Sequence, residues 1–215
     1  MPRPEIHPTD GMLDAARDLL LGKGARSATI EAIAEVSGAP TGSIYHRFGS
    51  RDELIARLWI RAVYRSQASF VAAMERDDPK EAAIAAATSI LDFCDEHPED
   101  AQLLVAFRRE DLIRALPEGS LADELAALNR PVERAIVQLA RRLYGTRSRA
   151  ALDRTLLVTF DLPYGAARRY LITGSRLPSG LRSDLVRAAE AVVDKPLRRV
   201  RDDVAAHRGG ARRGR

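Results

Sequence analysis

Residues 29–51 read TIEAIAEVSGAPTGSIYHRFGSR, and this stretch decides the fold of the amino-terminal part of the chain. The pattern predicts two short helices joined by a tight turn. Ile33 and Ala34 lie at helical spacing behind Thr29, whose hydroxyl can accept a hydrogen bond from a free backbone N–H at the start of the helix. Gly38 can adopt the left-handed conformation that ends a helix. The first helix is therefore expected to stop at this glycine.

The second predicted helix follows Pro40, whose fixed φ suits the first position of a helix. Ile44 places an apolar side chain on the face that turns back to the first helix. The opposite face carries the hydrogen-bonding or cationic side chains Thr41, Ser43, Tyr45, His46 and Arg47. Such groups reach phosphates and base edges, and a short helix that is buried on one side and polar on the other is what a helix-turn-helix reader of DNA requires.

This stretch resembles the DNA-binding domain of the TetR (tetracycline-repressor) family of transcriptional regulators. The matching residues are Thr29, Ile33, Ala34, Gly38, the run Thr41-Gly42-Ser43-Ile44-Tyr45-His46, Phe48, Ser50, Arg51 and Leu54. Three positions depart from the common pattern: Thr41 replaces a frequent Lys, Pro40 a frequent Ser and Gly49 a frequent Pro. The missing lysine bears on one phosphate contact and on the bases read. The close match covers the first quarter of the chain.

The DNA-facing residues divide by the contact expected of each. We expect Thr41, Ser43 and Arg47 to face base edges in the groove. The resemblance implies that Tyr45 and His46 bond phosphates. The alternatives are a packing role for Tyr45 and a solvated side chain for His46.

Three further residues complete the predicted DNA-binding set. Thr29 is expected to present a helix N-terminus to a phosphate. The resemblance implies a phosphate contact for Arg51 and includes Gly42 in the matched run.

The rest of the chain predicts an all-α protein with about nine helices. Residues 1–50 are expected to form a three-helix DNA-binding domain behind an arm, residues 1–9, that contains three prolines. Residues 51–204 are expected to form a larger helical domain for ligand binding and dimerisation. Residues 205–215 form a basic tail without a large apolar side chain, and disorder is expected there.

A capping box, Ser50 with Glu53, opens a long helix that leads from the first domain into the second. The resemblance makes this helix the lever between ligand and DNA. Beyond it, the apolar pattern predicts one helix over residues 99–116, a helix over residues 121–144 that bends at Pro131, and a helix over residues 148–173 that is interrupted at Pro163.

Two helical regions, residues 148–173 and 180–195, look like the pair through which many TetR-family proteins form homodimers. Ala188, Ala189 and Val192 would allow close approach of two helices. The alternative is that these residues face only their own core. The resemblance also implies a pocket for an unknown small molecule in the second domain. Its wall residues are predicted to be Trp59, Val63, Phe93, Phe107, Phe160 and Tyr164, although each could instead be ordinary core.

The net charge of +4 is unevenly distributed along the chain. Residues 195–215 carry eight basic and two acidic residues, a net charge of +6, which leaves about −2 for residues 1–194. The tail is therefore expected to add affinity for DNA that does not depend on sequence. The predicted DNA-binding domain depends instead on the placement of individual groups.

Catalytic, metal and cofactor sites are not expected. The sequence has no phosphate-binding glycine loop and no Gly-x-Ser-x-Gly elbow. Cys94 and His97 lie three residues apart, which is half of a metal site, and no second cluster accompanies them. The single cysteine, the absence of a signal peptide at the amino terminus and apolar runs too short for a membrane span fit a cytoplasmic protein.

The sequence thus favours a homodimeric, ligand-responsive repressor of the TetR type that binds a palindromic operator in double-stranded DNA. One alternative is a helical small-molecule-binding or enzyme domain that keeps the motif without binding a specific operator. Another is a nucleoid-type protein that binds any DNA through its tail. Sequence preference separates the repressor from both.

Overall fold

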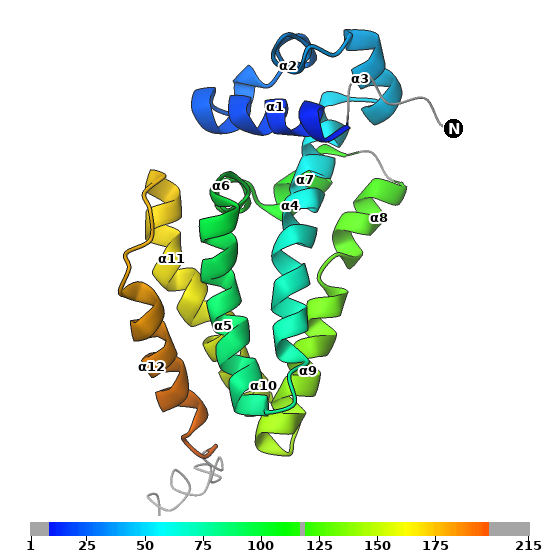
Figure 1. Cartoon of the computed structure of the whole chain (residues 1–215). Coiled ribbons are helices and arrows are strands. Elements are labelled where there is room, and N and C mark those ends of the chain that lie inside the picture. The colour runs from blue at the N-terminus through cyan, green and yellow to red at the C-terminus, as the bar shows by residue number, and fades with distance from the viewer. Residues whose placement is uncertain (1–8, 117–118, 198–215) are drawn as a thin grey trace, which may run out of the picture.

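The computed structural model describes residues 9–116 and 119–197 (Figure 1). The first eight residues of the predicted arm and the basic tail lie outside the described residues. The described residues form helices and contain no strand. The α-helices are α1 (Thr9–Lys23), α2 (Ile30–Ser37), α3 (Thr41–Phe48), α4 (Arg51–Met74), α5 (Pro79–Glu96), α6 (Pro98–Ala106), α7 (Arg109–Ala115), α8 (Ser120–Ala127), α9 (Arg130–Tyr144), α10 (Arg149–Leu156), α11 (Leu162–Thr173) and α12 (Leu181–Val193).

Two pairs of these segments form continuous or bent helices, so the described residues contain ten helices, close to the nine expected. Between α8 and α9, Leu128 and Asn129 keep right-handed helical dihedral angles, and α9 restarts with Pro131 in its first turn. Between α10 and α11 lies a π-helical turn, η2 (Leu157–Asp161). The all-α fold is confirmed.

The π-helical turn explains how the helix passes Pro163. A proline inside an α-helix lacks an N–H donor, and its ring clashes with the carbonyl of the preceding turn. In η2 the Leu162 N–H donates to the Leu157 carbonyl, five residues back, so the turn just before the proline is widened. The buried hydroxyls of Thr155 and Thr159 each donate a hydrogen bond of 2.9 Å to the carbonyl four residues earlier.

The prediction of a single helix over residues 99–116 is wrong, because the helix is interrupted between α6 and α7. Phe107 and Arg108 have extended backbone angles, with φ of −118° and −96°. The Phe107 carbonyl accepts a hydrogen bond from the indole N–H of Trp59 in α4, at 3.3 Å. This contact between distant residues satisfies a carbonyl at the break, and nothing in the local sequence signals it.

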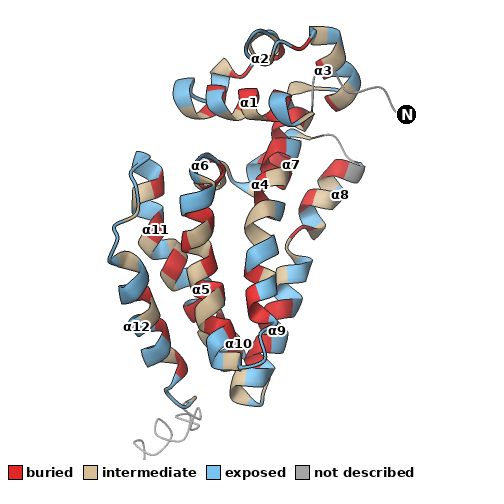
Figure 2. Cartoon of the chain, in the orientation of Figure 1, coloured by how far each residue is buried: buried red, intermediate tan, exposed pale blue. Residues whose placement is uncertain are grey.

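Figure 1 shows α1–α3 gathered at one end of the molecule, with α4 running from them into the larger helical domain. One apolar cluster joins the cores of α1–α3 to residues 54–63 of α4 and to side chains from α6, α7 and α8. Two further clusters lie around α5, which packs against α4 and α12 among other helices. In Figure 2 the buried residues follow these inner faces of the helices. The long helix α4 therefore belongs to the core at both of its ends.

Candidate nucleic-acid interface and effector region

The turn between α2 and α3 has the geometry that its sequence predicts. The Thr29 hydroxyl accepts a hydrogen bond from the Ala32 N–H at 3.2 Å, which caps α2. Gly38 ends α2 in the left-handed conformation, with φ 70° and ψ 5°. Ile33 and Ile44 are fully buried in the same apolar cluster. Burial of these two side chains fixes the angle between α2 and α3.

The outer face of α3 presents the predicted reader residues to solvent. Gly42, Tyr45 and His46 are exposed, and Tyr45 keeps 49% of its surface accessible. Thr41 and Ser43 are half-buried on the same short helix. Ile44 and Phe48 hold the other face of α3 in the core, and α3 lies at one end of the molecule (Figure 2).

Two of the predicted DNA-contacting arginines bind groups within the protein. The Arg47 guanidinium donates to the Thr9 hydroxyl at 2.8 Å and so links α3 to the start of α1. Arg51 donates from Nε to the Ala28 carbonyl at 2.7 Å and forms an ion pair with Asp52 at 3.0 Å. These bonds hold the segment before α2 in place. Contact of either arginine with DNA stays a prediction.

The six residues predicted to line a ligand pocket lie in three separate places. Trp59 and Val63 are buried in the cluster shared with α1–α3, and Phe107 packs against them. Phe93 lies in a second cluster, where its ring contacts that of His97.

Phe160 and Tyr164 stack on each other with ring centroids 5.4 Å apart, and Phe160 is 43% exposed. That the six residues together line one pocket stays a prediction.

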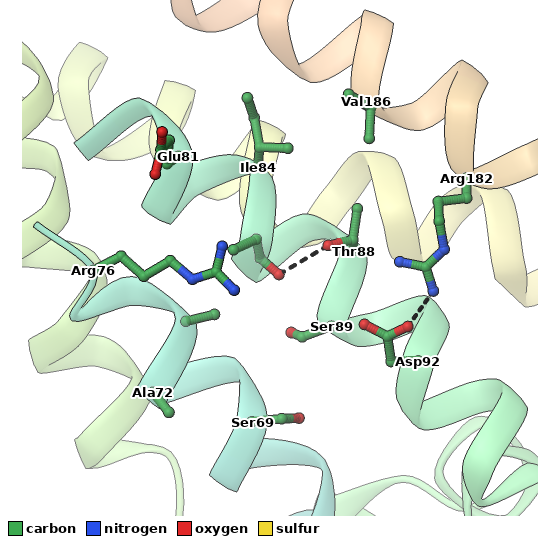
Figure 3. A pocket seen from close by; sticks show the side chains of 12 residues that line it. Ser69, Ala72, Arg76, Glu81, Ile84, Thr88, Ser89, Asp92, Arg182 and Val186 are labelled. Atoms are coloured by element: carbon green, nitrogen blue, oxygen red, sulfur yellow. Dashed lines mark hydrogen bonds and ion pairs between the residues drawn. The ribbon is translucent and has the colours of Figure 1, made fainter. Parts of the chain in front are cut away.

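The hollow in the larger domain is instead bounded by α4, α5 and α12 (Figure 3). It measures about 660 Å³, a size suited to a small molecule. Its lining residues are Ser69, Ala72, Ala73, Arg76, Glu81, Ile84, Ala85, Thr88, Ser89, Asp92, Arg182 and Val186. None of the six predicted wall residues is among them. Sequence reasoning missed this set because it looked for large apolar side chains, whereas small and charged ones surround this space.

The lining combines a mainly small apolar floor with charges at its edges. Ala85 and Thr88 come from α5, and the Thr88 hydroxyl donates to the Ala85 carbonyl at 3.2 Å. Arg182 of α12 forms an ion pair with Asp92 of α5, and both residues line the hollow. Figure 3 shows the Arg76 side chain reaching into the space from the segment that follows α4. A ligand here would therefore touch α4, α5 and α12 together.

The half metal site considered from the sequence does not extend to a cluster. Cys94 is buried in α5, and burial, with a smaller contribution from Asp95, raises the pKa of its thiol to about 11. His97 follows the end of α5. Among the described residues, no three His, Cys, Asp or Glu side chains are grouped so that they could hold a metal ion.

Comparison with known families identifies the amino-terminal domain. Residues 12–58 match the family described as "Bacterial regulatory proteins, tetR family". The chain carries the DNA-binding domain of the TetR family. A search of curated protein sequences found no match.

Solved structures extend the TetR likeness to the whole fold. The TetR family transcriptional regulator PfmR from Thermus thermophilus is similar at a TM-score of 0.66 and 19% identity, over 87% of this chain and 99% of that one. The fatty acid degradation regulator FadR from Bacillus halodurans is similar at 0.65 and 13%, over 87% and 98% of the two chains.

A TetR-like regulator from a Rhodococcus species is similar at 0.59 and 20%, over 89% and 96%. The chain therefore has the fold of TetR-family regulators. The family match over residues 12–58 supports a DNA-binding transcriptional regulator. None of the helices in the described ranges is long and apolar enough to cross a membrane.

Proposed function

We propose that this protein is a homodimeric, ligand-responsive repressor that binds a two-fold-symmetric operator. The observation that carries the proposal is α3, which is anchored by Ile44 and Phe48 and presents an exposed polar face at the end of a TetR-type domain. A cytoplasmic location, with access to DNA, and a role other than catalysis belong to the same proposal.

The reader set in this proposal is the one expected from the sequence. Thr41, Ser43 and Arg47 face the bases, with Gly42 allowing close approach of the backbone. Phosphates are bound by Tyr45, His46, Thr29 and Arg51.

The dimer would form through α10, η2, α11 and α12. Leu157 and Phe160 are 38% and 43% exposed, and Ile172 is 56% exposed, so this long helix presents apolar side chains to solvent in the single chain. On α12, Ala188 is exposed, while Ala189 is buried in the chain's own core. A second copy that covers these apolar side chains would place two α3 helices on one DNA. A pair of half-sites about 34–36 Å apart then binds far more tightly than one short helix alone.

The effector is a small molecule, and the hollow between α4, α5 and α12 is our candidate for its site. Helix α4 has 24 residues and is therefore about 36 Å long. Its last turns line the hollow at Ser69 and Ala73, and its first turns pack into the core of α1–α3 at Leu54 and Leu58. A ligand that fits one position of α4 better than another would shift the orientation of the DNA-binding domain, in proportion to that difference in affinity.

Selection of binders from a random DNA pool at near-physiological salt tests this function. We expect recovery of a two-fold-symmetric sequence. Arg47→Ala should then bind that sequence more weakly by about 1–3 kcal/mol. The control is Arg114→Ala, because Arg114 is an exposed arginine on α7, outside the α1–α3 domain. Recovery of no sequence preference, with binding that collapses as salt rises, would refute the repressor and leave the basic tail as the DNA-binding element.

A further inference from the structure

A buried carboxylate joins the DNA-binding domain to the larger domain. Asp100 is the only charged residue among those described that is fully buried, with 1% of its surface exposed. It lies in the first turn of α6, where the helix dipole favours a negative charge. Burial of a charge is costly unless the charge is paired and hydrogen-bonded, so the partners of Asp100 determine whether this arrangement is stable.

The two oxygens of Asp100 bind arginines from two different helices. Oδ2 accepts from Arg65 of α4 at 2.8 Å. Oδ1 accepts from Arg17 of α1 at 3.3 Å. Arg17 belongs to the DNA-binding domain, whereas Asp100 belongs to the larger one. One carboxylate therefore bridges α1, α4 and α6 at the point where the two domains meet (Figure 1).

The ion pairs continue along the contact between α1 and α4. Arg17 also binds Asp14 at 3.1 Å, and Arg61 of α4 binds Asp14 at 2.6 Å and Asp10 at 2.8 Å. We call the bridge formed by Arg17, Asp100 and Arg65, together with the pair of Arg61 and Asp14, the ionic latch.

Within the described part of the chain, the buried Nε of Arg61 has no hydrogen-bond partner. The latch therefore leaves one of its buried donors without an acceptor in the protein.

The ionic latch connects the hollow to the DNA-binding domain by a route other than α4. Helix α5 lines the hollow from Glu81 to Asp92, and α6 follows it after His97. A displacement of α5 therefore moves the start of α6, and with it Asp100. Apolar contacts tolerate small shifts, whereas a buried carboxylate that loses its arginine is strongly unfavourable. When α6 moves, α1 therefore either moves with it or the bridge breaks.

We propose that Asp100 is a positioning residue that fixes the orientation of the DNA-binding domain, and hence the spacing of half-sites that the dimer accepts. This inference rests on the proposed function. It assigns part of the coupling between effector and DNA to the contact of α1 with α6.

The test compares Asp100→Asn with the wild-type protein on operators of altered spacing. Asparagine keeps the shape and removes the charge. The control is Asp111→Asn, which removes the same charge from an exposed ion pair with Arg114 on α7, away from the proposed dimer helices and the hollow. The probes are the operator selected by the wild-type protein and a version with one base pair inserted between its half-sites. The insertion turns one half-site by about 35° and moves it by about 3.4 Å relative to the other.

We expect the insertion to weaken binding strongly for the wild-type protein and for Asp111→Asn. The measured quantity is the affinity for the selected operator divided by the affinity for the operator with the insertion. In Asp100→Asn this ratio should fall about fivefold or more, a typical size for a coupling between sites. Loss of stability alone lowers both affinities equally and leaves the ratio unchanged. If Asp100→Asn does not fold, Arg17→Gln serves instead, because the carboxylate then keeps Arg65. An unchanged ratio in a folded variant overturns the proposal.

A second measurement needs no DNA and separates this inference from the proposed function. Spin labels at Glu31→Cys in α2 and Glu96→Cys in α5, both exposed positions, report the distance between the domains in a Cys94→Ser chain diluted with unlabelled protein. We expect a broader distance distribution in Asp100→Asn, and an unchanged one overturns the latch. If the wild-type protein selects no symmetric DNA, the proposed function fails while this measurement still decides the role of Asp100.

Discussion

Substitution of Gly38 by alanine tests the geometry on which the DNA-binding surface depends. Gly38 has φ 70°, and a Cβ added there would meet no atom within 4 Å. The cost of Gly38→Ala is therefore a backbone cost alone. A left-handed alanine is unfavourable by about 1–2 kcal/mol. Alanine also lowers the conformational entropy of the unfolded chain, which stabilises the folded protein by about 0.4–1 kcal/mol. We expect a net loss of roughly 1 kcal/mol in the free energy of unfolding.

Gly22→Ala is the matched control for this substitution. Gly22 lies in α1, and a Cβ there would also meet nothing within 4 Å, but its φ is not positive. Alanine should stabilise this helical position by about 0.5–1 kcal/mol. The two variants, which add the same methyl group, should therefore differ by about 2 kcal/mol. Gly38→Asn should fall between them, because asparagine tolerates the left-handed region.

Urea denaturation followed by the fluorescence of Trp59, the single tryptophan, measures these differences. All variants are compared at one protein concentration, because the stability of a dimer depends on concentration. In thermal unfolding, 1 kcal/mol corresponds to about 2–4 °C for a chain of this length. Equal stabilities for Gly38→Ala and Gly22→Ala would refute the left-handed turn, and with it the placement of α3 relative to α2.

Three further predictions use other parts of the molecule. Ser50→Ala should cost about 1 kcal/mol of stability, because it removes the acceptor that binds the Glu53 N–H at 3.2 Å and caps α4; Ser183→Ala, whose hydroxyl bonds a carbonyl on an exposed turn, is the control in the same denaturation assay. Cys94 should resist alkylation at pH 8 in the folded protein and react only after unfolding, since burial raises its pKa to about 11 and keeps the thiol protonated; rapid reaction under native conditions, followed by mass spectrometry, would contradict its burial. Deletion of residues 205–215 removes four arginines and should make the slope of log affinity against log salt shallower by up to about 3–4, with sequence preference unchanged; the same slope in the shortened chain would exclude the tail from DNA binding.

The helix-turn-helix could be predicted from the sequence because its signals are local. The cap at Thr29 and the turn at Gly38 each act over a few residues, and the structure contains both. Pro131 and Pro163 also indicated the bend and the interruption in later helices, since proline removes a donor wherever it occurs. The π-helical form of the second interruption depends on how the helix packs and could not be foreseen.

The candidate effector region could not be predicted in this way. Aromatic residues such as Trp59 and Phe93 are typical of pockets and of cores alike, and the structure places both in packed clusters. The hollow is lined by Ala72 and Ala85, residue types that carry no signal in a sequence. The break at Phe107 was missed for a similar reason, because its hydrogen bond comes from a tryptophan 48 positions away.

The sequence by itself determined the elements: where α2 and α3 begin and end, which face of each is apolar, and the family of the amino-terminal domain. The tertiary structure alone decided that Asp100, which in the sequence looks like an ordinary solvated acid, is buried between two domains. Its partner Arg17 lies 83 residues earlier in the chain. Caps and turns depend on neighbours a few residues away, whereas the burial of a charge depends on which distant helices the packing brings together.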